Sequence, residues 1–256
     1  MNLEILQDKI VDFIWNETHK AGVSGAVIGI SGGIDSALTA ALTVKALGKD
    51  KVLGIYLPES GLTTSVDTED AKAVADWLGI ELRTIDISGI VAAFMDTIPD
   101  SESASYLARG NLKPRIRMSI LYFHANQMNR MVIGTGNKTE ILLGYYTKYG
   151  DGGVDLEPIG GLYKTEVWEL SRMLGVPEPL ITKKPSAGLW KGQTDEAELG
   201  ISYLKVDNVL RLLELNEAPE TIISSLDVSR EQLDSVIMRI ERNKHKRKSP
   251  PVPEFY

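Results

Sequence analysis

A buried strand, a glycine-rich turn and a helix follow one another near the start of the chain. Residues 26–30 read Ala-Val-Ile-Gly-Ile, an apolar run without alternation, which is typical of a strand covered on both faces. The run breaks into Ser-Gly-Gly-Ile-Asp-Ser at residues 31–36, and residues 36–47 have the Ala- and Leu-rich composition of a helix. This unit constrains the fold because a buried strand followed directly by a helix favours a parallel sheet.

The same alternation continues along the chain after an amphipathic first helix that ends near Gly22. Pro114 is expected near the start of a long helix, where its missing N–H costs nothing. Strands that alternate with helices predict a parallel sheet with helices on both faces, so the predicted fold is α/β and doubly wound. The predicted elements are strands at 52–57, 80–87 and 131–134, and helices at 67–78, after Ser88 and over 111–128.

The alternation of strands and helices gives way to a loop-rich region in the second half of the chain. Residues 144–194 are rich in glycine, with one helical stretch at 165–174, and a loop-rich region of this length is more often functional than idle. From Asp195 onward the pattern is helical again. We predict a single domain over 1–256, in which residues 195–248 form additional C-terminal helices.

Composition excludes several classes of protein. The formal charge of −7 argues against a coat for DNA or RNA, which needs a basic surface. The absence of Cys excludes thiolate nucleophiles and Cys-ligated metals, and the scattered positions of His19, His124 and His245 favour a hard cation such as Mg²⁺ over zinc. No signal peptide and no membrane-spanning run is evident, so we expect a cytoplasmic protein without a membrane partner.

The glycine turn is suited to a phosphate. Successive glycines allow the backbone N–H groups to approach an anion, and the next helix adds its positive end. The turn is neither a P-loop, because no Lys follows, nor a dinucleotide fingerprint, because its glycines are wrongly spaced. Residues 31–36 instead resemble the PP-loop ATP pyrophosphatase superfamily, which implies that residues 29–36 bind ATP and that ATP is cleaved to AMP and pyrophosphate.

A second candidate site follows the fourth predicted strand. Ligands of a doubly wound sheet bind beyond the carboxyl ends of its strands. Asp35 and Glu140 each follow such an end, and two carboxylates that converge there would hold Mg²⁺.

Longer motifs narrow the family. Three motifs lie at residues 134–140 (Gly-Thr-Gly-Asn-Lys-Thr-Glu), 144–152 (Gly-Tyr-Tyr-Thr-Lys-Tyr-Gly-Asp-Gly) and 155–159 (Asp-Leu-Glu-Pro-Ile). They are followed by Leu-Tyr-Lys-Thr at 162–165, by the runs 184–190 and 193–200, and by His-Lys-Arg at 245–247. In these motifs the chain resembles the ammonia-dependent NAD synthetases over nearly its whole length. The resemblance implies an adenine nucleotide α hydrolase-like fold. It also implies a ligase that amidates deamido-NAD with ammonia through an adenylated nicotinate carboxylate.

At the matching positions the resemblance implies residue roles. Catalysis is assigned to Asp35, Lys148 and Lys164, and Mg²⁺ binding to Asp35 and Glu140. The residues assigned to ATP are Gly29, Ile30, Ser31, Gly32, Gly33, Ile34, Asp35, Ser36, Thr135, Lys164 and Ser186. The residues assigned to deamido-NAD are Arg115, Lys148, Asp155, His245 and Lys246.

The chain departs from the family at one position. Many relatives carry an aspartate where this sequence has Gly188, so one possible metal ligand is missing. Residues 183–194 are a candidate lid that would protect the adenylate from water. The resemblance also implies a homodimer with deamido-NAD near the subunit boundary, and the chain has no room for a glutamine-hydrolysing domain.

Two alternative functions stay open. One is another PP-loop ligase, similar to GMP synthetase or to a tRNA-modifying enzyme, although the chain lacks the broad basic face or zinc-binding cysteines expected of the latter. The other is a non-catalytic nucleotide-binding module. Release of pyrophosphate in the presence and absence of deamido-NAD would separate the three.

Overall fold

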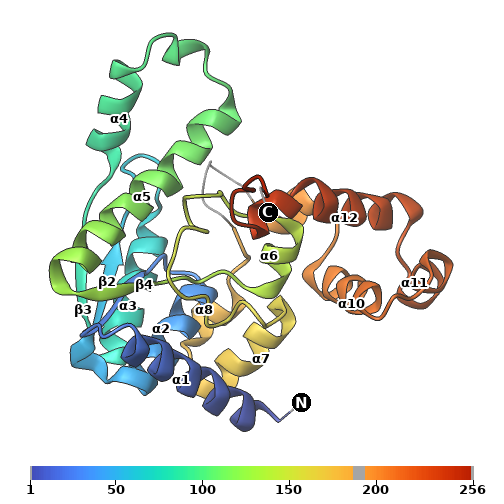
Figure 1. Ribbon diagram of the computed structural model, residues 1–256, viewed down its shortest axis with the longest axis horizontal. Coiled ribbons are helices and arrows are strands. Elements are labelled where there is room, and N and C mark those ends of the chain that lie inside the picture. Colours follow the sequence, from blue (N-terminus) through green and yellow to red (C-terminus); the bar gives the residue numbers. More distant parts are fainter. Residues whose placement is uncertain (1, 187–193, 255–256) are drawn as a thin grey trace.

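One parallel sheet forms the centre of the molecule (Figure 1). The computed structural model describes residues 2–186 and 194–254, and within them the strands are ordered β3-β2-β1-β4. Val27 in the middle of the sheet pairs with Leu53 on one side and with Val132 on the other. The doubly wound α/β prediction is confirmed. The strands are β1 (Gly25–Gly29), β2 (Val52–Tyr56), β3 (Glu81–Thr84) and β4 (Arg130–Ile133).

Helices cover both faces because alternate residues of the strands point to opposite sides. Ala26 and Ile28 belong to a core shared with α1, α2, α3, α7 and α8, whereas Val27 and Leu53 belong to a second core shared with α4 and α5. The bounds on the first face are α1 (Leu3–Lys20), α2 (Ile34–Leu47), α3 (Ser65–Leu78), α7 (Lys164–Leu174) and α8 (Glu178–Thr182). On the second face they are α4 (Ser88–Thr97) and α5 (Tyr106–Met128).

The order of the strands creates a switch point between β1 and β4. The chain moves outward from β1 to β2 and β3 through α2 and α3, and then returns across the other face through α4 and α5 to place β4 on the opposite side of β1. Crevices at such reversals, beyond the carboxyl ends of the strands, are the ligand sites of this architecture. The loops that follow β1 and β4 are therefore brought together.

Two boundaries differ from the sequence predictions. The helix expected from 111 starts at Tyr106, because the hydroxyl of Ser105 accepts a hydrogen bond from the N–H of Ala108 at 3.2 Å and caps it there. Pro114 consequently lies inside α5, and its expected place near the helix start is wrong. The third strand covers only Glu81–Thr84 instead of 80–87, and it is the edge strand of the sheet.

The C-terminal helices form a layer of their own. Tyr203, Val209 and Leu233 are the centre of a third core that also includes Leu143 and Tyr163, so this layer packs on the helices next to the switch point. Figure 1 shows it to one side of the sheet. Its members are α6 (Lys138–Leu143), α9 (Asp195–Leu199), α10 (Tyr203–Glu214), α11 (Pro219–Leu226) and α12 (Arg230–Arg242), followed by the 3-10 helix η3 (Lys244–Arg247).

An arm built from α4 and the first turns of α5 projects from the body (Figure 1). Its tip carries the short 3-10 helix η2 (Ser101–Ser103), and another, η1 (Lys49–Lys51), precedes β2. Among the described helices, none combines the length and the apolar character that crossing a membrane requires.

Candidate active site

The turn between β1 and α2 is held in shape by its own hydroxyl groups. The hydroxyl of Ser36 accepts a hydrogen bond from the N–H of Ser31 at 3.2 Å and donates to the carbonyl of Gly33 at 2.9 Å. Gly32 has a φ of +76°, and a Cβ added there would lie 2.6 Å from the carbonyl oxygen of Asp67. Only glycine satisfies both conditions, so the turn has the shape that an anion-binding loop before a helix requires.

A capping box orients the loop that follows β4. The side chain of Asn137 accepts a hydrogen bond from the N–H of Glu140 at 3.0 Å, and the carboxylate of Glu140 accepts one from the N–H of Asn137 at 3.3 Å. This reciprocal pair begins α6 and fixes the Glu140 side chain at the end of the sheet.

Lys164 connects the two loops. Its side chain is 2% exposed, and its ammonium group contacts the carboxylate of Asp35 in the first turn of α2. The other oxygen of Asp35 accepts a hydrogen bond from the Nδ2 group of Asn137 at 3.0 Å. The structure therefore brings Asp35 and Lys164 into contact, and links both to the loop that carries Glu140.

The electrostatics of this cluster are compatible with a bound metal cation. Burial and the neighbouring charge of Asp35 hold the pKa of Glu140 well above its usual range. Burial opposes the charge on Lys164, but the carboxylates of Asp35 and Glu140 outweigh this effect and raise its pKa. Two carboxylates that repel one another beside a phosphate loop fit Mg²⁺, which often takes one or two carboxylates and completes its shell with phosphate oxygens and water. In the described part of the chain, no group of three or more potential metal-binding side chains gathers anywhere.

Asp207 on α10 supports the site from behind. Its carboxylate is buried, accepts a hydrogen bond from the Thr139 hydroxyl at 2.6 Å, and accepts another from the N–H of Thr165 at 2.8 Å. The hydroxyl of Thr139 in turn accepts from the N–H of Lys164 at 3.0 Å. Asp207 thereby fixes the beginnings of α6 and α7, which carry Glu140 and Lys164.

Lys183 is a residue of this site that sequence reasoning missed. Its ammonium group donates to the carbonyl of Gly32 at 3.1 Å and lies 2.7 Å and 2.6 Å from the carboxylates of Asp67 and Asp70. It joins the glycine turn at residues 31–36, hereafter called the phosphate loop after its expected ligand, to the first turns of α3. Asn137 was also missed, although the Asn-x-x-Glu spacing of a capping box could have indicated it.

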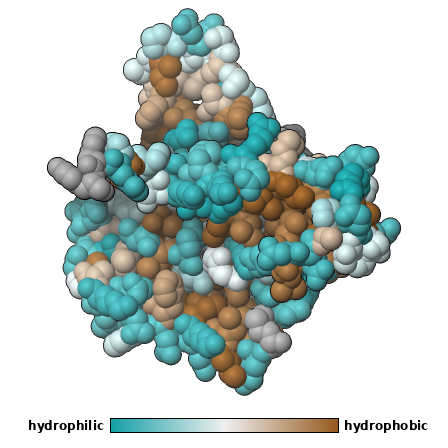
Figure 2. Space-filling view, turned by 45° about the vertical axis from the view of Figure 1, so that its right-hand side comes forward, coloured by the Kyte–Doolittle hydropathy of each residue, from teal (hydrophilic) through white to brown (hydrophobic). Residues whose placement is uncertain are grey.

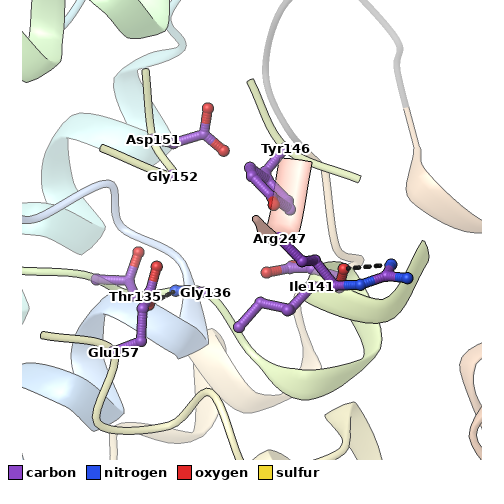
Figure 3. Close-up of a pocket in the computed structure, with 9 residues that line it drawn as sticks. Thr135, Gly136, Ile141, Tyr146, Asp151, Gly152, Glu157 and Arg247 are labelled. Atoms are coloured by element: carbon purple, nitrogen blue, oxygen red, sulfur yellow. Dashed lines mark hydrogen bonds between the residues drawn. The ribbon is translucent and has the colours of Figure 1, made fainter. Parts of the chain in front are cut away.

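A cavity of about 250 Å³ opens beside this cluster (Figure 3). Its lining includes Thr135 and Glu140, the residues assigned to ATP and Mg²⁺, together with Glu157, which the sequence analysis did not single out. Figure 3 shows Asp151 and Tyr146 turned toward the same space as Glu157 and Thr135, whereas the guanidinium of Arg247 is turned outward. The remaining lining residues are Gly136, Ile141 and Gly152.

Most of the residues assigned to deamido-NAD lie together. Nη2 of Arg115 donates to the carbonyl of Lys148 at 3.4 Å, and Nζ of Lys148 donates to the carbonyl of His245 at 2.9 Å. Lys246 follows His245, and its ammonium group donates to the carbonyls of Gly144 and Tyr146. This group of four basic residues near the end of α6 is hereafter called the basic cluster: Arg115, Lys148, His245 and Lys246.

Asp155, the remaining residue assigned to deamido-NAD, and Ser186, assigned to ATP, both lie apart from the basic cluster. Asp155 accepts hydrogen bonds from the N–H of Val132 at 2.8 Å and from the Tyr122 hydroxyl at 2.9 Å, which places it alongside β4. Ser186 follows α8 and is exposed. The lid expected at 183–194 lies largely outside the described residues, as does Gly188.

Comparison with protein-family models matches residues 6–250 to the family described as NAD synthase. The chain belongs to the NAD synthase family. This confirms the family to which the sequence motifs pointed. The match spans both the sheet and the C-terminal helices, so it includes the residues around the switch point.

Individual NAD synthase relatives agree with the family match. The chain is 74% identical over 256 residues, covering all of both chains, to the NH(3)-dependent NAD(+) synthetase of Methanosarcina acetivorans. Among solved structures, the NH3-dependent NAD synthetase of Campylobacter jejuni superposes with a TM-score of 0.83 at 33% identity, covering 99% of this chain and 100% of the other. The NMN synthetase of Francisella tularensis superposes with a TM-score of 0.88 at 36% identity and covers both chains completely.

Proposed function

We propose that this NAD synthase family member is a ligase that uses ATP to amidate deamido-NAD with ammonia, giving NAD⁺, AMP and pyrophosphate. The contact between Asp35 and Lys164, at the switch point beside the glycine turn, is the observation that carries the proposal. This arrangement brings together the glycine turn for phosphate, the buried ammonium group of Lys164 and the carboxylate of Asp35 proposed to bind metal. The full-length identity to NH(3)-dependent NAD(+) synthetases supports the choice of substrates.

Activation is the first step of the proposed reaction. The nicotinate carboxylate attacks the α-phosphorus of ATP, and pyrophosphate leaves to give the acyl adenylate. The N-terminal end of α2 and the ammonium group of Lys164 would stabilise the negative charge that gathers on the leaving phosphates. Holding two anionic substrates in line is worth up to about 7–11 kcal/mol, more than any single hydrogen-bond donor, so positioning is the main contribution of the protein.

Asp35 and Glu140 are the residues that would hold Mg²⁺. The bound ion would neutralise the charge of the phosphates and favour the departure of pyrophosphate. Lys164 contacts Asp35 directly, so its ammonium group keeps this carboxylate in place when ATP is absent.

The basic cluster is the proposed site of the dinucleotide. Deamido-NAD brings its own pyrophosphate and a carboxylate, and Arg and Lys side chains suit both. Arg115 is exposed and Lys148 is partly exposed, and the guanidinium of Arg115 donates a hydrogen bond to the carbonyl of Lys148. Their positive charges can therefore face a bound anion. Asp155 is proposed to hold the dinucleotide from the β4 side.

One observation supports a second substrate for the amidation. The solved structure titled NMN synthetase from Francisella tularensis has a TM-score of 0.88 and matches this chain over its full length. The corresponding reaction here would amidate the mononucleotide of nicotinate. The 74% identity to an NH(3)-dependent NAD(+) synthetase favours the dinucleotide as the main substrate.

We further propose a homodimer joined through α4 and α5, in the cytoplasm, where ATP is available. Large apolar side chains on these helices are exposed to solvent: Phe94 on α4 by 45%, and Leu107 and Phe123 on α5 by 69% and 63%. Contact with a second copy of the chain would bury such apolar surface. Figure 2 shows apolar surface on the arm. Arg115, Ser119 and Phe123 follow one another at helical i, i+4 steps, so a partner against Phe123 would lie close to the basic cluster.

Release of pyrophosphate tests the function. The purified chain is incubated with ATP, Mg²⁺ and ammonium, with deamido-NAD, nicotinate mononucleotide or no acceptor, and NAD⁺ or NMN is measured in parallel. We expect release to depend on deamido-NAD and to match NAD⁺ formation. A higher kcat/KM with the mononucleotide would favour the second acceptor. Release that no acceptor stimulates would leave a nucleotide-binding module, and stimulation by another acceptor would indicate a different PP-loop ligase.

A further inference from the structure

Two glycines make room for the carboxylate of Glu157 at the end of β4. A Cβ at Gly134 would lie 2.6 Å from Cδ of Glu157, and a Cβ at Gly136 would lie 3.2 Å from its Oε2. The N–H of Gly136 donates to Oε2 at 3.0 Å. The loop Gly-Thr-Gly is therefore shaped around this side chain, and Thr135, assigned to ATP, lies between the two glycines.

The free side of Glu157 faces the cavity beside the reaction centre. Oε1 makes no hydrogen bond within the described residues, and the cavity that Glu157 lines also includes Thr135 and Glu140. The cavity volume of about 250 Å³ is enough for a small molecule next to the nucleotide. Asp151 and Tyr146 complete the side opposite Glu157 (Figure 3), so a second carboxyl group and a phenol line the same space.

Amidation by ammonium needs a group that accepts a proton, and none of the residues proposed for the activation step has this role. Near neutral pH ammonia is present mainly as ammonium, which has no lone pair for attack on the acyl carbon. A proton acceptor of comparable basicity must remove one proton in the site. An exposed glutamate is too weak a base, whereas burial raises the pKa of Glu157 to about 8, with a smaller contribution from the charge of Asp151.

We infer that Glu157 is a catalytic residue of the amidation step, which binds ammonium in this cavity and takes one of its protons. Oε1 accepts the proton, the nitrogen lone pair forms the C–N bond with the acyl carbon, and the C–O bond to AMP breaks. The second proton of the former ammonium nitrogen passes to solvent as AMP leaves. The inference deepens the proposed function and rests on it.

The other charged groups around the cavity suit a cation. Burial raises the pKa of Glu140 on α6 and of Asp151 after it, so a cation in the cavity would favour the ionised form of both carboxyl groups. Tyr146 is neutral, and Nζ of Lys246 lies 5.3 Å from the centre of its ring. Arg247 on η3 is the positive group of the lining, but its guanidinium is engaged with the carbonyls of Ile141, Leu142 and Ile240. An ammonium ion in the cavity would therefore have carboxyl groups on both sides, Glu157 on one and Asp151 on the other.

A change of nucleophile tests the role of Glu157. Glu157→Gln keeps the acceptor for the Gly136 N–H but cannot take a proton. Hydroxylamine is largely neutral near pH 7 and attacks acyl adenylates without losing a proton first, so it bypasses the base. We expect Glu157→Gln to lower kcat/KM for ammonium by about 100-fold, the usual contribution of general base catalysis, while hydroxamate formation stays at the wild-type rate.

Three measurements complete the experiment. Deamido-NAD-dependent exchange of pyrophosphate into ATP should be unchanged in Glu157→Gln, which shows that the variant is folded and activates its substrate. Its deficit with ammonium should shrink as the pH rises and free ammonia accumulates. Glu169→Gln, an exposed glutamate on α7, is the matched control.

Equal losses with both nucleophiles, or an unchanged reaction with ammonium, would overturn the role of Glu157. A wild-type chain that forms no NAD⁺ from ammonium would instead overturn the proposed function. The two failures are therefore distinguishable.

Discussion

Asp35 and Lys164 are each other's main electrostatic partner, and this makes the site a source of stability as well as of chemistry. Asp35→Asn leaves an ammonium group that is 2% exposed without its charged partner. Breaking a buried pair on one side costs about 3–5 kcal/mol, although Glu140 nearby offsets part of it, so we expect a loss toward the lower end of that range. Turnover with Mg²⁺ should be abolished.

Denaturant unfolding without nucleotide or metal measures the effect. Glu220→Gln, which removes an exposed pair with Arg230, is the control and should leave the unfolding midpoint unchanged. A wild-type midpoint in Asp35→Asn would show that the pair contributes nothing to folding.

Glu157 should also leave a signature in the pH dependence of stability. Its pKa is about 8 in the folded protein against an ordinary value of 4.5, so the folded state binds this proton more tightly than the unfolded state does. Between these two values its contribution to stability falls as the pH rises. We expect Glu157→Gln to have a Tm close to wild type near pH 5 and a higher Tm than wild type by about pH 8.5. A constant difference across this range would contradict the raised pKa.

The positions predicted from the sequence match the structure best for residues whose placement follows from the local sequence pattern. Asp35 and Glu140 were expected at the ends of two strands because parallel strands end on the same edge, and the structure places them there. The hydrogen bond from Asn137 to Asp35 and the role of Glu157 depend instead on loops that meet only in three dimensions. Nothing in the run Asp-Leu-Glu-Pro distinguishes Glu157 from an exposed carboxylate until the glycines of the β4 loop are packed around it.

At the scale of elements, the phosphate loop is braced from outside by Lys183. It connects the carbonyl of Gly32 to Asp67 and Asp70 near the beginning of α3. In Lys183→Met the loop loses this brace, and two carboxylates lose their counter-charge beside the phosphates. We expect KM for ATP to rise roughly tenfold, the loss expected for one hydrogen bond to a charged group.

Steady-state kinetics with each substrate varied in turn checks this expectation. KM for deamido-NAD should stay near wild type, which separates a local effect on the loop from a general loss of fold. Lys72→Met, an exposed lysine on α3, is the matched control. An unchanged KM for ATP would show that the loop keeps its shape without Lys183.

The boundaries of elements were harder to predict than their existence. The cap at Ser105 and the interior Pro114 of α5 show the reason, since a proline is tolerated inside a helix whose packing compensates for one lost hydrogen bond. The edge position of β3 likewise shortens a strand whose apolar pattern runs further. Such compensation comes from tertiary contacts, which the sequence pattern does not contain.

At the scale of the whole molecule, the single domain over 1–256 stays a prediction. Its distinct cores share elements, because α6 and α7 contribute to the C-terminal core while α7 also packs on the sheet. We therefore expect thermal unfolding to follow one cooperative transition with and without substrates. Two resolved transitions would indicate that the C-terminal helices unfold independently.

The exposed apolar side chains on α5 lead to a prediction about assembly. In wild type we expect a solution mass close to twice 28.1 kDa by analytical ultracentrifugation. The variant Phe123→Glu places a charge two turns along α5 from Arg115 and should be monomeric, with weaker binding of deamido-NAD. Val66→Glu, at a similarly exposed position on α3, should remain a dimer. A monomeric wild type would contradict the proposed interface.

The hydrogen bonds from η3 to the end of α6 have a consequence for folding during synthesis on the ribosome. Arg247 and Lys246 hold the carbonyls of residues 141–146, so the wall of the cavity is completed by residues that are translated long after the phosphate loop. At about 5–20 residues per second, the sheet has many seconds to form before that wall arrives. The growing chain can therefore fold around a nucleotide loop well before it can shelter a reactive adenylate.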